Sequence, residues 1–387
     1  MKINRFVEKM RSFQSNLLEL LEDESYSKDK YETFVEHITE QKIYDDQHEL
    51  KALLYIIDGI SKNHRRSHDF ISNIEQVLRH FEKDIQKFFS NSEIFKIFQN
   101  NKRILLFLIE EQLMTIDEYI FSIMTSYRNE NYCEYFQPEI KPFLTKEKIE
   151  KFCKQNENLK KDEFFESMSK DIDENFYEKR REGENDDFLC RLIRFNKIQE
   201  FITFVEQTNL SLQSALIKKS IFETNKLLTN KEKISLIEYA SFYGSNDIIK
   251  YMKMKGVELT ADMWTYAIHS GNAELIRYLE ENHVSPPENK YNNILGESIE
   301  CHHNEISNYF IEYLFKEEDL QNSIENKYYC NMYRSAVKSH NYYFFPENMK
   351  RKNMLSYLCE FDYYTLVSLC LEEMNVDINV KIKTTIF

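Results

Sequence analysis

Two neighbouring stretches of the chain carry the same helix–turn–helix pattern. Residues 236–257 read LIEYASFYGSNDIIKYMKMKGV, and residues 263–284 read MWTYAIHSGNAELIRYLEENHV. A shift of 27 positions aligns the two copies, and the residues that they share include Tyr239 with Tyr266, Ala240 with Ala267, Gly244 with Gly271, Ile249 with Ile276 and Tyr251 with Tyr278. A phrase repeated at this length is typical of proteins built from stacked, similar units.

Each copy contains the residues that a helical hairpin requires. The small alanine lets two helices approach closely, and the glycine four positions later can adopt the positive φ that ends the first helix and reverses the chain. Ile248, Ile249 and Met252 form an apolar face that one unit cannot bury by itself. Neighbouring units must therefore stack.

Four weaker copies of the pattern occur elsewhere in the chain. The residues at their alanine positions are Leu192, Ser298, Ala336 and Leu358. In the first two of these copies, Asn196 and His302 replace the glycine. The spacing between copies varies, which indicates insertions and deletions between units, so we expect about six units of unequal length.

Composition predicts an all-α fold. The 387 residues include only six glycines and five prolines, well below average usage, so turns are few. The hydrophobic content of 42% is typical of a folded chain.

The first part of the chain reads as amphipathic helices without a clear repeat. Apolar residues that return every three or four positions predict helices over residues 3–21, 28–41, 48–63, 67–90, 145–153 and 162–179. A segment at 92–109 weakly matches the repeat, with Lys96 at the alanine position. The charge run EKRREGENDD at 178–187 is the strongest predicted boundary. We therefore divide the chain into an all-helical N-terminal domain, 1–182, and a repeat domain, 183–387.

The repeat pattern resembles the ankyrin repeat, in which a small residue, two variable positions and a glycine precede a second helix with an aliphatic core. Residues 220–284, continuing into CHHNEISNYF, are similar to an ankyrin-type domain of unknown function that is expanded in trichomonad protists. The resemblance implies an ankyrin-like solenoid that binds a protein partner through its concave face. The Thr-Pro-Leu-His opening of ankyrin units is replaced by SLIE at 235–238 and DMWT at 262–265, so the hydrogen bonds that this opening makes between units are not expected.

The resemblance also implies which residues meet a partner, because two positions before the turn glycine and one before the exit glycine line the ankyrin groove. In the clear copies these positions hold Phe242, Tyr243, Lys255, His269, Ser270 and Asn282. In the weaker copies they hold Glu300 and Cys301, and also Arg194, Phe195, Lys338, Ser339, Glu360 and Phe361. The aromatic pair Phe242 and Tyr243 either forms a binding hot spot or only covers neighbouring helices. We expect Trp264 to pack in the core.

No motif for catalysis or for cofactor binding occurs in the sequence. It contains no GxG phosphate loop, no HExxH and no paired Cys/His spacing of the zinc type. We therefore expect no enzymatic activity, no cofactor, no metal and no small-molecule ligand. The alternative is an enzyme or ligand-binding protein with a site in the N-terminal domain or at the domain junction, which a deep pocket with shifted pKa values would favour.

Charge and hydropathy restrict the class of partner. The net charge is −14, with 28 basic against 35 acidic residues in 1–180 and 23 against 30 in the remainder. Neither half has the basic excess that nucleic-acid binding requires. The longest apolar run, residues 104–109, is too short to span a membrane. Seven cysteines without a CxxC pair suit the cytoplasm.

Three weak metal patterns are interpreted as non-binding. In Cys301–His303 the side chains of adjacent helical residues point in different directions. Positions 171–182 mimic a calcium loop, but Phe176 stands where the loop needs glycine. His64 and His68 are one helical turn apart, but the two arginines that follow His64 would repel a cation.

The chain ends NVDINVKIKTTIF, which opens a further unit without a helix to complete it. A solenoid needs a polar cap at its end. We expect that the terminus frays, that a partner covers it, or that the gene is truncated.

Overall fold

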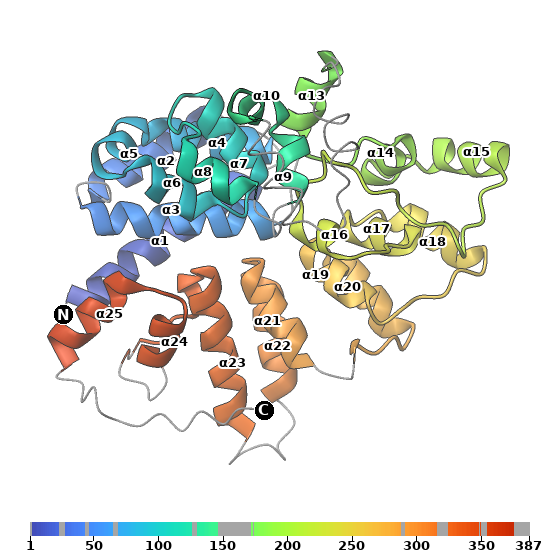
Figure 1. Ribbon diagram of the computed structural model, residues 1–387. Helices are drawn as coiled ribbons and strands as arrows, with labels where there is room; N and C mark the ends of the chain where they lie inside the picture. Colours follow the sequence, from blue (N-terminus) through green and yellow to red (C-terminus); the bar gives the residue numbers. More distant parts are fainter. Residues whose placement is uncertain are drawn as a thin grey trace. The chain divides into compact units, whose positions relative to one another are not determined.

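The computed structural model is all-α over the residues that it describes (Figure 1). These are residues 2–22, 28–42, 46–64, 69–125, 130–145, 172, 174–287, 291–315, 324–347, 349 and 354–374. Within them the only β-type pairing is an isolated bridge between Leu216 and Ser235. The predicted fold class is confirmed at this level. No helix in the described part is both long and apolar enough to cross a bilayer.

The chain forms two compact units that do not follow sequence order. The first contains residues 1–76, 241–244 and 258–387, and the second contains residues 77–240 and 245–257. The boundary expected near residue 182 therefore lies inside the second unit. The first 76 residues belong with the end of the chain because they pack against its helices, which no local pattern could indicate.

The N-terminal helices begin and end close to the predicted positions. They are α1 (Lys2–Glu22), α2 (Lys28–Gln41), α3 (Gln47–Asn63), α4 (Phe70–His80) and α5 (Glu82–Phe88). The helix predicted over 67–90 is split at Phe81, whose φ of −91° and ψ of 4° interrupt the helical conformation.

The second unit continues with short helices. These are α6 (Asn91–Phe98), α7 (Lys102–Glu110), α8 (Glu118–Met124), α9 (Glu130–Tyr135), α10 (Gln137–Ile140), the 3₁₀ turn η2 (Lys141–Phe143), α13 (Glu174–Glu182), α14 (Phe188–Arg194), α15 (Ile198–Thr208) and α16 (Lys226–Asn230). The predicted helix at 145–153, and most of that at 162–179, lie outside the described residues.

The repeat copies form helix pairs. After α14 and α15 these are α17 (Leu236–Phe242) with α18 (Asn246–Met254), α19 (Met263–His269) with α20 (Ala273–Glu281), α21 (Tyr291–Glu300) with α22 (Asn304–Phe315), α23 (Ile324–Ser339) with the 3₁₀ turn η5 (Tyr342–Phe344), and α24 (Met354–Glu360) with α25 (Tyr364–Met374). Ala240, Ala267 and Trp264 are fully buried in these pairs, as expected.

The turns of the six copies share one backbone geometry. The residue at the glycine position is left-handed in all of them: Asn196 (φ 49°), Gly244 (65°), Gly271 (60°), His302 (59°), His340 (56°) and Asp362 (58°). The N–H of the next residue donates to the carbonyl five residues earlier over 2.8–3.3 Å, which closes a Schellman-type helix end. The alignment of the copies is therefore confirmed. The weak match at 92–109 differs, because Asn100 is not left-handed.

The residue that follows each turn ties neighbouring hairpins together. Its side chain bonds to a backbone carbonyl of the preceding turn in four cases: Ser245 to Ile193, Asn272 to Gly244 (3.3 Å), His303 to His269 (3.3 Å) and Asn341 to Ile299 (2.9 Å). These bonds link successive hairpins where the ankyrin opening is absent. The SLIE segment instead forms a capping box, in which the Ser235 N–H donates to Glu238 Oε2 over 2.8 Å.

The first helix of the chain covers the last hairpins of the same unit. In Figure 1, α1 lies beside α25. The buried amide of Gln14 donates to Asn341 Oδ1 and accepts from the Tyr342 N–H, both over 2.7 Å. Helix α1 thus packs against both α25 and η5. Residues 375–387, on which the expectation of an uncapped end was based, lie outside the described residues.

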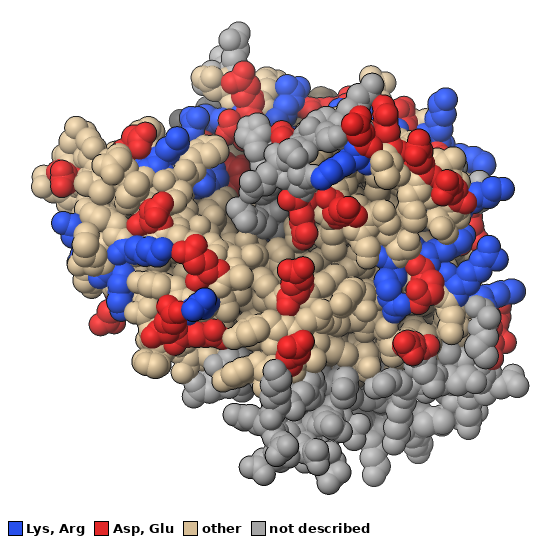
Figure 2. Space-filling model, turned by 180° about the vertical axis from the view of Figure 1, so that it is seen from behind, with Lys and Arg blue, Asp and Glu red and all other residues tan. Residues whose placement is uncertain are grey.

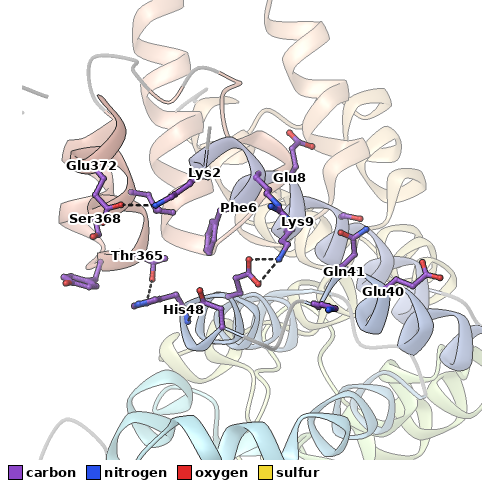
Figure 3. Close-up of a pocket in the computed structure, with 17 residues that line it drawn as sticks. Lys2, Phe6, Glu8, Lys9, Glu40, Gln41, His48, Thr365, Ser368 and Glu372 are labelled. Carbon is purple, nitrogen blue, oxygen red and sulfur yellow. Dashed lines mark hydrogen bonds and ion pairs between the residues drawn. The ribbon is translucent and has the colours of Figure 1, made fainter. Parts of the chain in front are cut away.

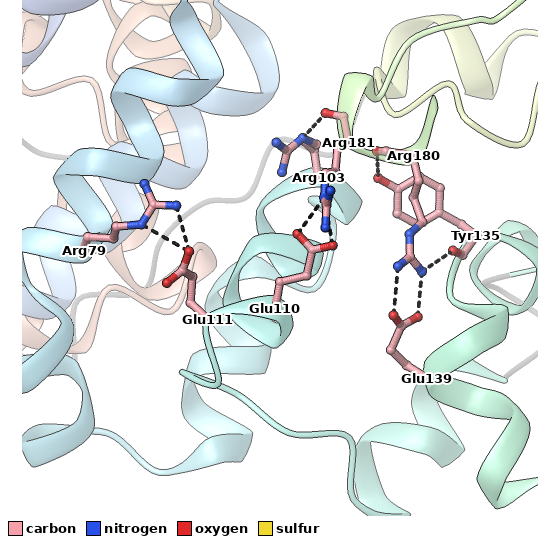
Figure 4. Close-up of polar contacts among 8 residues, drawn as sticks. All are labelled: Arg79, Arg103, Glu110, Glu111, Tyr135, Glu139, Arg180 and Arg181. Atoms are coloured by element: carbon pink, nitrogen blue, oxygen red, sulfur yellow. Dashed lines mark hydrogen bonds and ion pairs between the residues drawn. The ribbon is translucent and has the colours of Figure 1, made fainter. Parts of the chain in front are cut away.

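The charge run at 178–187 is not a solvated linker. Arg180 is only 1% exposed and forms a two-point ion pair with Glu139 at 2.7 and 2.9 Å (Figure 4). Its carbonyl accepts the Tyr135 hydroxyl over 2.7 Å, and Arg181 pairs with Glu110. A buried guanidinium requires such paired acceptors. The acceptor Glu139 lies 41 residues earlier in the chain.

Candidate functional site

Four of the rings at the ends of α17 and α19 form one aromatic group. Phe242 meets Tyr243 edge-on at 5.0 Å, stacks on His269 at 5.9 Å and contacts Tyr266 at 6.5 Å. Phe242 and Tyr243 are half-buried, so each supports its neighbours and also presents part of its ring to solvent. The two interpretations of this pair, packing and recognition, are therefore compatible. We call these four residues the aromatic group.

The equivalent positions in later hairpins carry charges in place of rings. Glu300 pairs with Lys338 at 2.7 Å, and Arg334 pairs with Glu360 in the next hairpin. Burial raises the pKa of Glu300, although Lys338 opposes this shift. The Glu300–Lys338 pair connects two positions that the sequence aligned with one another, whereas Arg334 lies four residues before Lys338, outside the aligned positions.

Three of the predicted partner-binding residues are enclosed in the protein. His269 is 6% exposed. Ser270 is 1% exposed and donates to the Ala267 carbonyl over 2.8 Å. Cys301 is fully buried, and its carbonyl accepts a hydrogen bond of 2.9 Å from His64 Nδ1. The Glu300 carbonyl likewise accepts from Asn63, over 3.2 Å. The end of α3 therefore covers this turn, and the side chains of His269, Ser270 and Cys301 are corrected from surface to interior positions.

Lys255 and Asn282 lie at the other end of their hairpins. Both are exposed, and their side chains make local contacts: the Lys255 ammonium lies 5.5 Å from the Tyr251 ring centre, and the Asn282 amide donates to the Tyr278 carbonyl over 2.8 Å. They follow the second helix of each pair, whereas the aromatic group ends the first. The structure thus does not join them to the aromatic group.

His269 belongs to a second cluster that sequence analysis missed. Its Nε2 hydrogen-bonds to Glu297, and the ligand atoms of His269, Glu297 and Cys301 all lie within 4.8 Å of one another. Burial opposes ionisation of Glu297, but the bond from His269 and the charge of Lys338 outweigh it, so its pKa is lowered. Burial, together with Glu297 and Glu300, raises the pKa of Cys301. The available signal was the spacing of Glu297 and Cys301, one helical turn apart.

The neighbouring histidines do not converge with Cys301, as expected. His302 Nε2 donates to the Ser339 carbonyl over 3.1 Å, whereas the His303 ring lies 4.4 Å from the His64 ring. Burial lowers the pKa of His302 to about 3 and that of His303 well below its usual value. Both rings are neutral packing groups. His68, the second member of the other histidine pattern, lies outside the described residues.

The second unit contains a small cavity of about 190 Å³. Glu134, Asn185, Glu223 and Tyr239 are among its lining residues. Burial lowers the pKa of the nearby Lys102 to about 8, against the opposing charges of Glu223 and Glu134. Buried titratable groups around a cavity are typical of binding sites, but the volume is smaller than the roughly 300 Å³ at which pockets for drug-sized ligands begin.

A larger cavity of about 970 Å³ lies between α1, α3 and α25 of the first unit (Figure 3). Lys9 pairs with Glu49 at 2.7 Å, and Lys2 lies 3.9 Å from Glu372 across it. Its basic and acidic side chains largely neutralise one another, so no class of charged ligand is favoured. Acidic and basic side chains are also interspersed over the face drawn in Figure 2.

Comparisons with known proteins add no family to these observations. No protein-family model matches the chain, and neither the curated proteins nor the solved structures gave a significant match.

Proposed function

We propose that the protein is a non-enzymatic, cytoplasmic scaffold or adaptor, and that its hairpins form an ankyrin-like solenoid that binds a partner protein. The observation that carries this proposal is the aromatic group, in which Phe242 and Tyr243 of one hairpin are partly exposed and contact rings of the next hairpin. Aromatic side chains held rigid by their neighbours are enriched among residues that dominate protein–protein binding. The free state of all five described cysteines supports a reducing compartment.

The burial of individual residues narrows the proposed surface. We keep Phe242, Tyr243 and Glu300 as its centre, and omit the enclosed side chains of His269, Ser270 and Cys301. Lys255 and Asn282 would contact only a partner large enough to reach the opposite ends of the hairpins. A contact surface of aromatic residues beside the Glu300–Lys338 pair suits a protein with an apolar anchor and a polar rim.

The test is a binding comparison between two matched double variants. Phe242→Ala with Tyr243→Ala removes the exposed rings, and Tyr309→Ala with Tyr313→Ala removes another exposed ring pair, stacked at 6.5 Å on α22. Partners are first captured with the tagged full-length protein from its own cells, and the affinity of a purified partner is then measured.

We expect the first variant to weaken binding by about 30-fold or more, as the loss of a hot spot of roughly 2 kcal/mol implies. The second variant should bind as the unchanged protein does. Equal affinities of both variants, with both still folded by circular dichroism, would refute this surface.

A ligand-binding function of the second unit is the alternative, and the cavity beside Glu223 and Tyr239 favours it. The thiol of Cys190, whose pKa burial raises to about 12, is unsuited to nucleophilic attack. The cavity therefore suits the binding of a small polar ligand better than the catalysis of a reaction. A thermal-shift screen of small metabolites would support this function if a hit lost its effect on Glu223→Gln.

A further inference from the structure

Three side chains that can act as metal ligands lie together where the aromatic group meets the end of α21. His269 ends α19, Glu297 lies in the last turn of α21, and Cys301 follows that helix. Glu297 and Cys301 are four positions apart, which places both side chains on one face. One imidazole nitrogen, one carboxylate oxygen and one thiol sulfur come within 4.8 Å of one another.

We propose that His269, Glu297 and Cys301 bind one zinc ion. Thiolate, imidazole and carboxylate are the three side-chain ligands that zinc takes in proteins, in a tetrahedral arrangement. Bond lengths of about 2.0–2.3 Å place such donors roughly 3.3–3.8 Å apart. The present limit of 4.8 Å therefore requires only small side-chain movements, each of about 1 Å or less.

The other ring nitrogen of His269 provides an independent observation. His269 is 6% exposed, and its Nδ1 is buried without a hydrogen-bond partner, while Nε2 bonds to Glu297. An unpaired buried nitrogen is costly in a protein interior. An ion bound by Nδ1 would satisfy this nitrogen and leave Nε2 to hold its hydrogen bond to Glu297, and a second hydrogen-bonded ring nitrogen is the usual arrangement of histidine ligands.

Charge balance favours a divalent cation over other occupants. The thiolate and the carboxylate together carry two negative charges, which equal the charge of the ion, so the bound group is neutral in a largely buried position. Calcium and magnesium are disfavoured because they require six or more oxygen ligands, which sulfur and nitrogen cannot supply. The Glu297 side chain is 31% exposed, which gives the ion a route from solvent. A water molecule would complete the tetrahedron.

The site would join the end of α19 to the end of α21 and so fix the position of His269. Sequence analysis expected no metal, because no ligand motif is visible in linear order; His269 and Glu297 are 28 residues apart. The inference is independent of the proposed function, since zinc binding is measured without a partner protein.

The first experiment is calorimetric titration of zinc into the chelator-treated, full-length protein. We expect one ion per chain. Cys301→Ser and His269→Gln should each lower the affinity by more than about 100-fold. The loss of a group that only hydrogen-bonds to a metal ligand already costs about 10–100-fold, and these substitutions remove a ligand itself. The matched controls Cys370→Ser, which alters another buried thiol, and Cys359→Ser, which removes an exposed one, should bind as the unchanged protein does.

Cobalt(II) provides the second readout, because a cobalt–thiolate bond has a sulfur-to-metal charge-transfer absorption. The band should appear with the unchanged protein and both control variants, and be lost in Cys301→Ser. If a substitution of a buried residue lowers the helical circular dichroism signal, Glu297→Gln replaces it as the test, because this side chain is partly exposed. We expect Glu297→Gln to lower the zinc affinity by about 10-fold or more. Absence of saturable zinc binding, or a charge-transfer band that survives Cys301→Ser, would overturn the proposal.

Discussion

The turns at Gly244 and Gly271 and those at His302 and His340 share one backbone conformation but have opposite side-chain arrangements. At the glycines the next hairpin packs onto the turn: a Cβ on Gly271 would lie 2.7 Å from the His303 ring, and one on Gly244 would lie 2.8 Å from the Asn272 amide. At the histidines the ring of the turn residue itself packs against another segment: His302 bonds to the Ser339 carbonyl and is 1% exposed. The repeat therefore fixes the backbone, and the neighbouring segment decides which side chain fits it.

Helix α3 is the segment that distinguishes the histidine turns. The His340 ring stacks on Tyr55 at 4.7 Å, and His302 lies 3.4 Å from the position that a Cβ on Gly59 would occupy. No such helix is needed at the glycine turns, where the next repeat fills the space. Degeneration of the repeat in the later hairpins thus accompanies their burial by the N-terminal helices.

The largest expected effect tests the glycine turns. Gly271→Ala should lower the free energy of unfolding by about 2–5 kcal/mol, because a left-handed alanine costs roughly 1–2 kcal/mol and overpacking against His303 adds about 1–3 kcal/mol. Gly256→Ala is the control: it is also left-handed, at φ 85°, but has no atom within 4 Å of its Cβ position. Urea unfolding of both variants measures the difference. Equal decreases in the free energy of unfolding would mean that the His303 ring moves aside without cost.

The histidine turns should make stability depend on pH. Burial, with a smaller contribution from Lys62, lowers the pKa of His340 to about 3. Above pH 6.5 the ring is neutral in both states; below it, only the unfolded chain takes up the proton, so stability falls until about pH 3. Between pH 7 and 5 this histidine should account for a loss of about 2 kcal/mol.

His340→Asn removes the titrating ring but keeps a residue that tolerates the left-handed conformation. Between pH 7 and 5 the free energy of unfolding of the variant should therefore fall by about 2 kcal/mol less than that of the unchanged protein. Urea unfolding at the two pH values measures both changes. An identical loss in both proteins would show that His340 can be protonated within the fold.

The close approach of α3 is tested by Gly59→Ala. The added methyl would lie 2.9 Å from the Ser339 backbone carbonyl, so we expect a net destabilisation of about 1–2 kcal/mol after the gain in helix propensity. Gly296→Ala in α21 is the matched control, because its Cβ would meet only the rotatable Ser335 hydroxyl at 3.0 Å. Chemical denaturation should give changes of opposite sign; stabilisation by both would contradict the proximity of α3.

The smallest effect is expected at the turn of the last hairpin. Asp362 is left-handed, at φ 58°, and exposed. Asp362→Gly should relieve backbone strain and stabilise the protein by about 0.5–1 kcal/mol. The corresponding His302→Gly should destabilise it, since the bond to Ser339 is lost. Thermal unfolding compares the stabilities of the two variants. If both substitutions stabilised the protein, the proposed difference between the exposed turn at Asp362 and the buried turn at His302 would be wrong.

The sequence by itself determined the helical class, the N-terminal helices and the six turns, because these features depend on short-range preferences. Apolar spacing along a few turns predicts a helix, and a small residue followed by a left-handed position predicts a hairpin. Even Asn196 and His302, which are not glycines, adopt the conformation that the alignment assigned to them.

Only the tertiary structure decided which of these residues are accessible. Cys301 and Ser270 are enclosed, Arg180 is a buried ion-pair partner, and Gln14 bonds to Asn341 across 327 residues of sequence. Glu297 meets His269 for the same reason. Burial and the convergence of side chains depend on which distant segments pack together, and the free energy of that packing is spread over many contacts that no local pattern records.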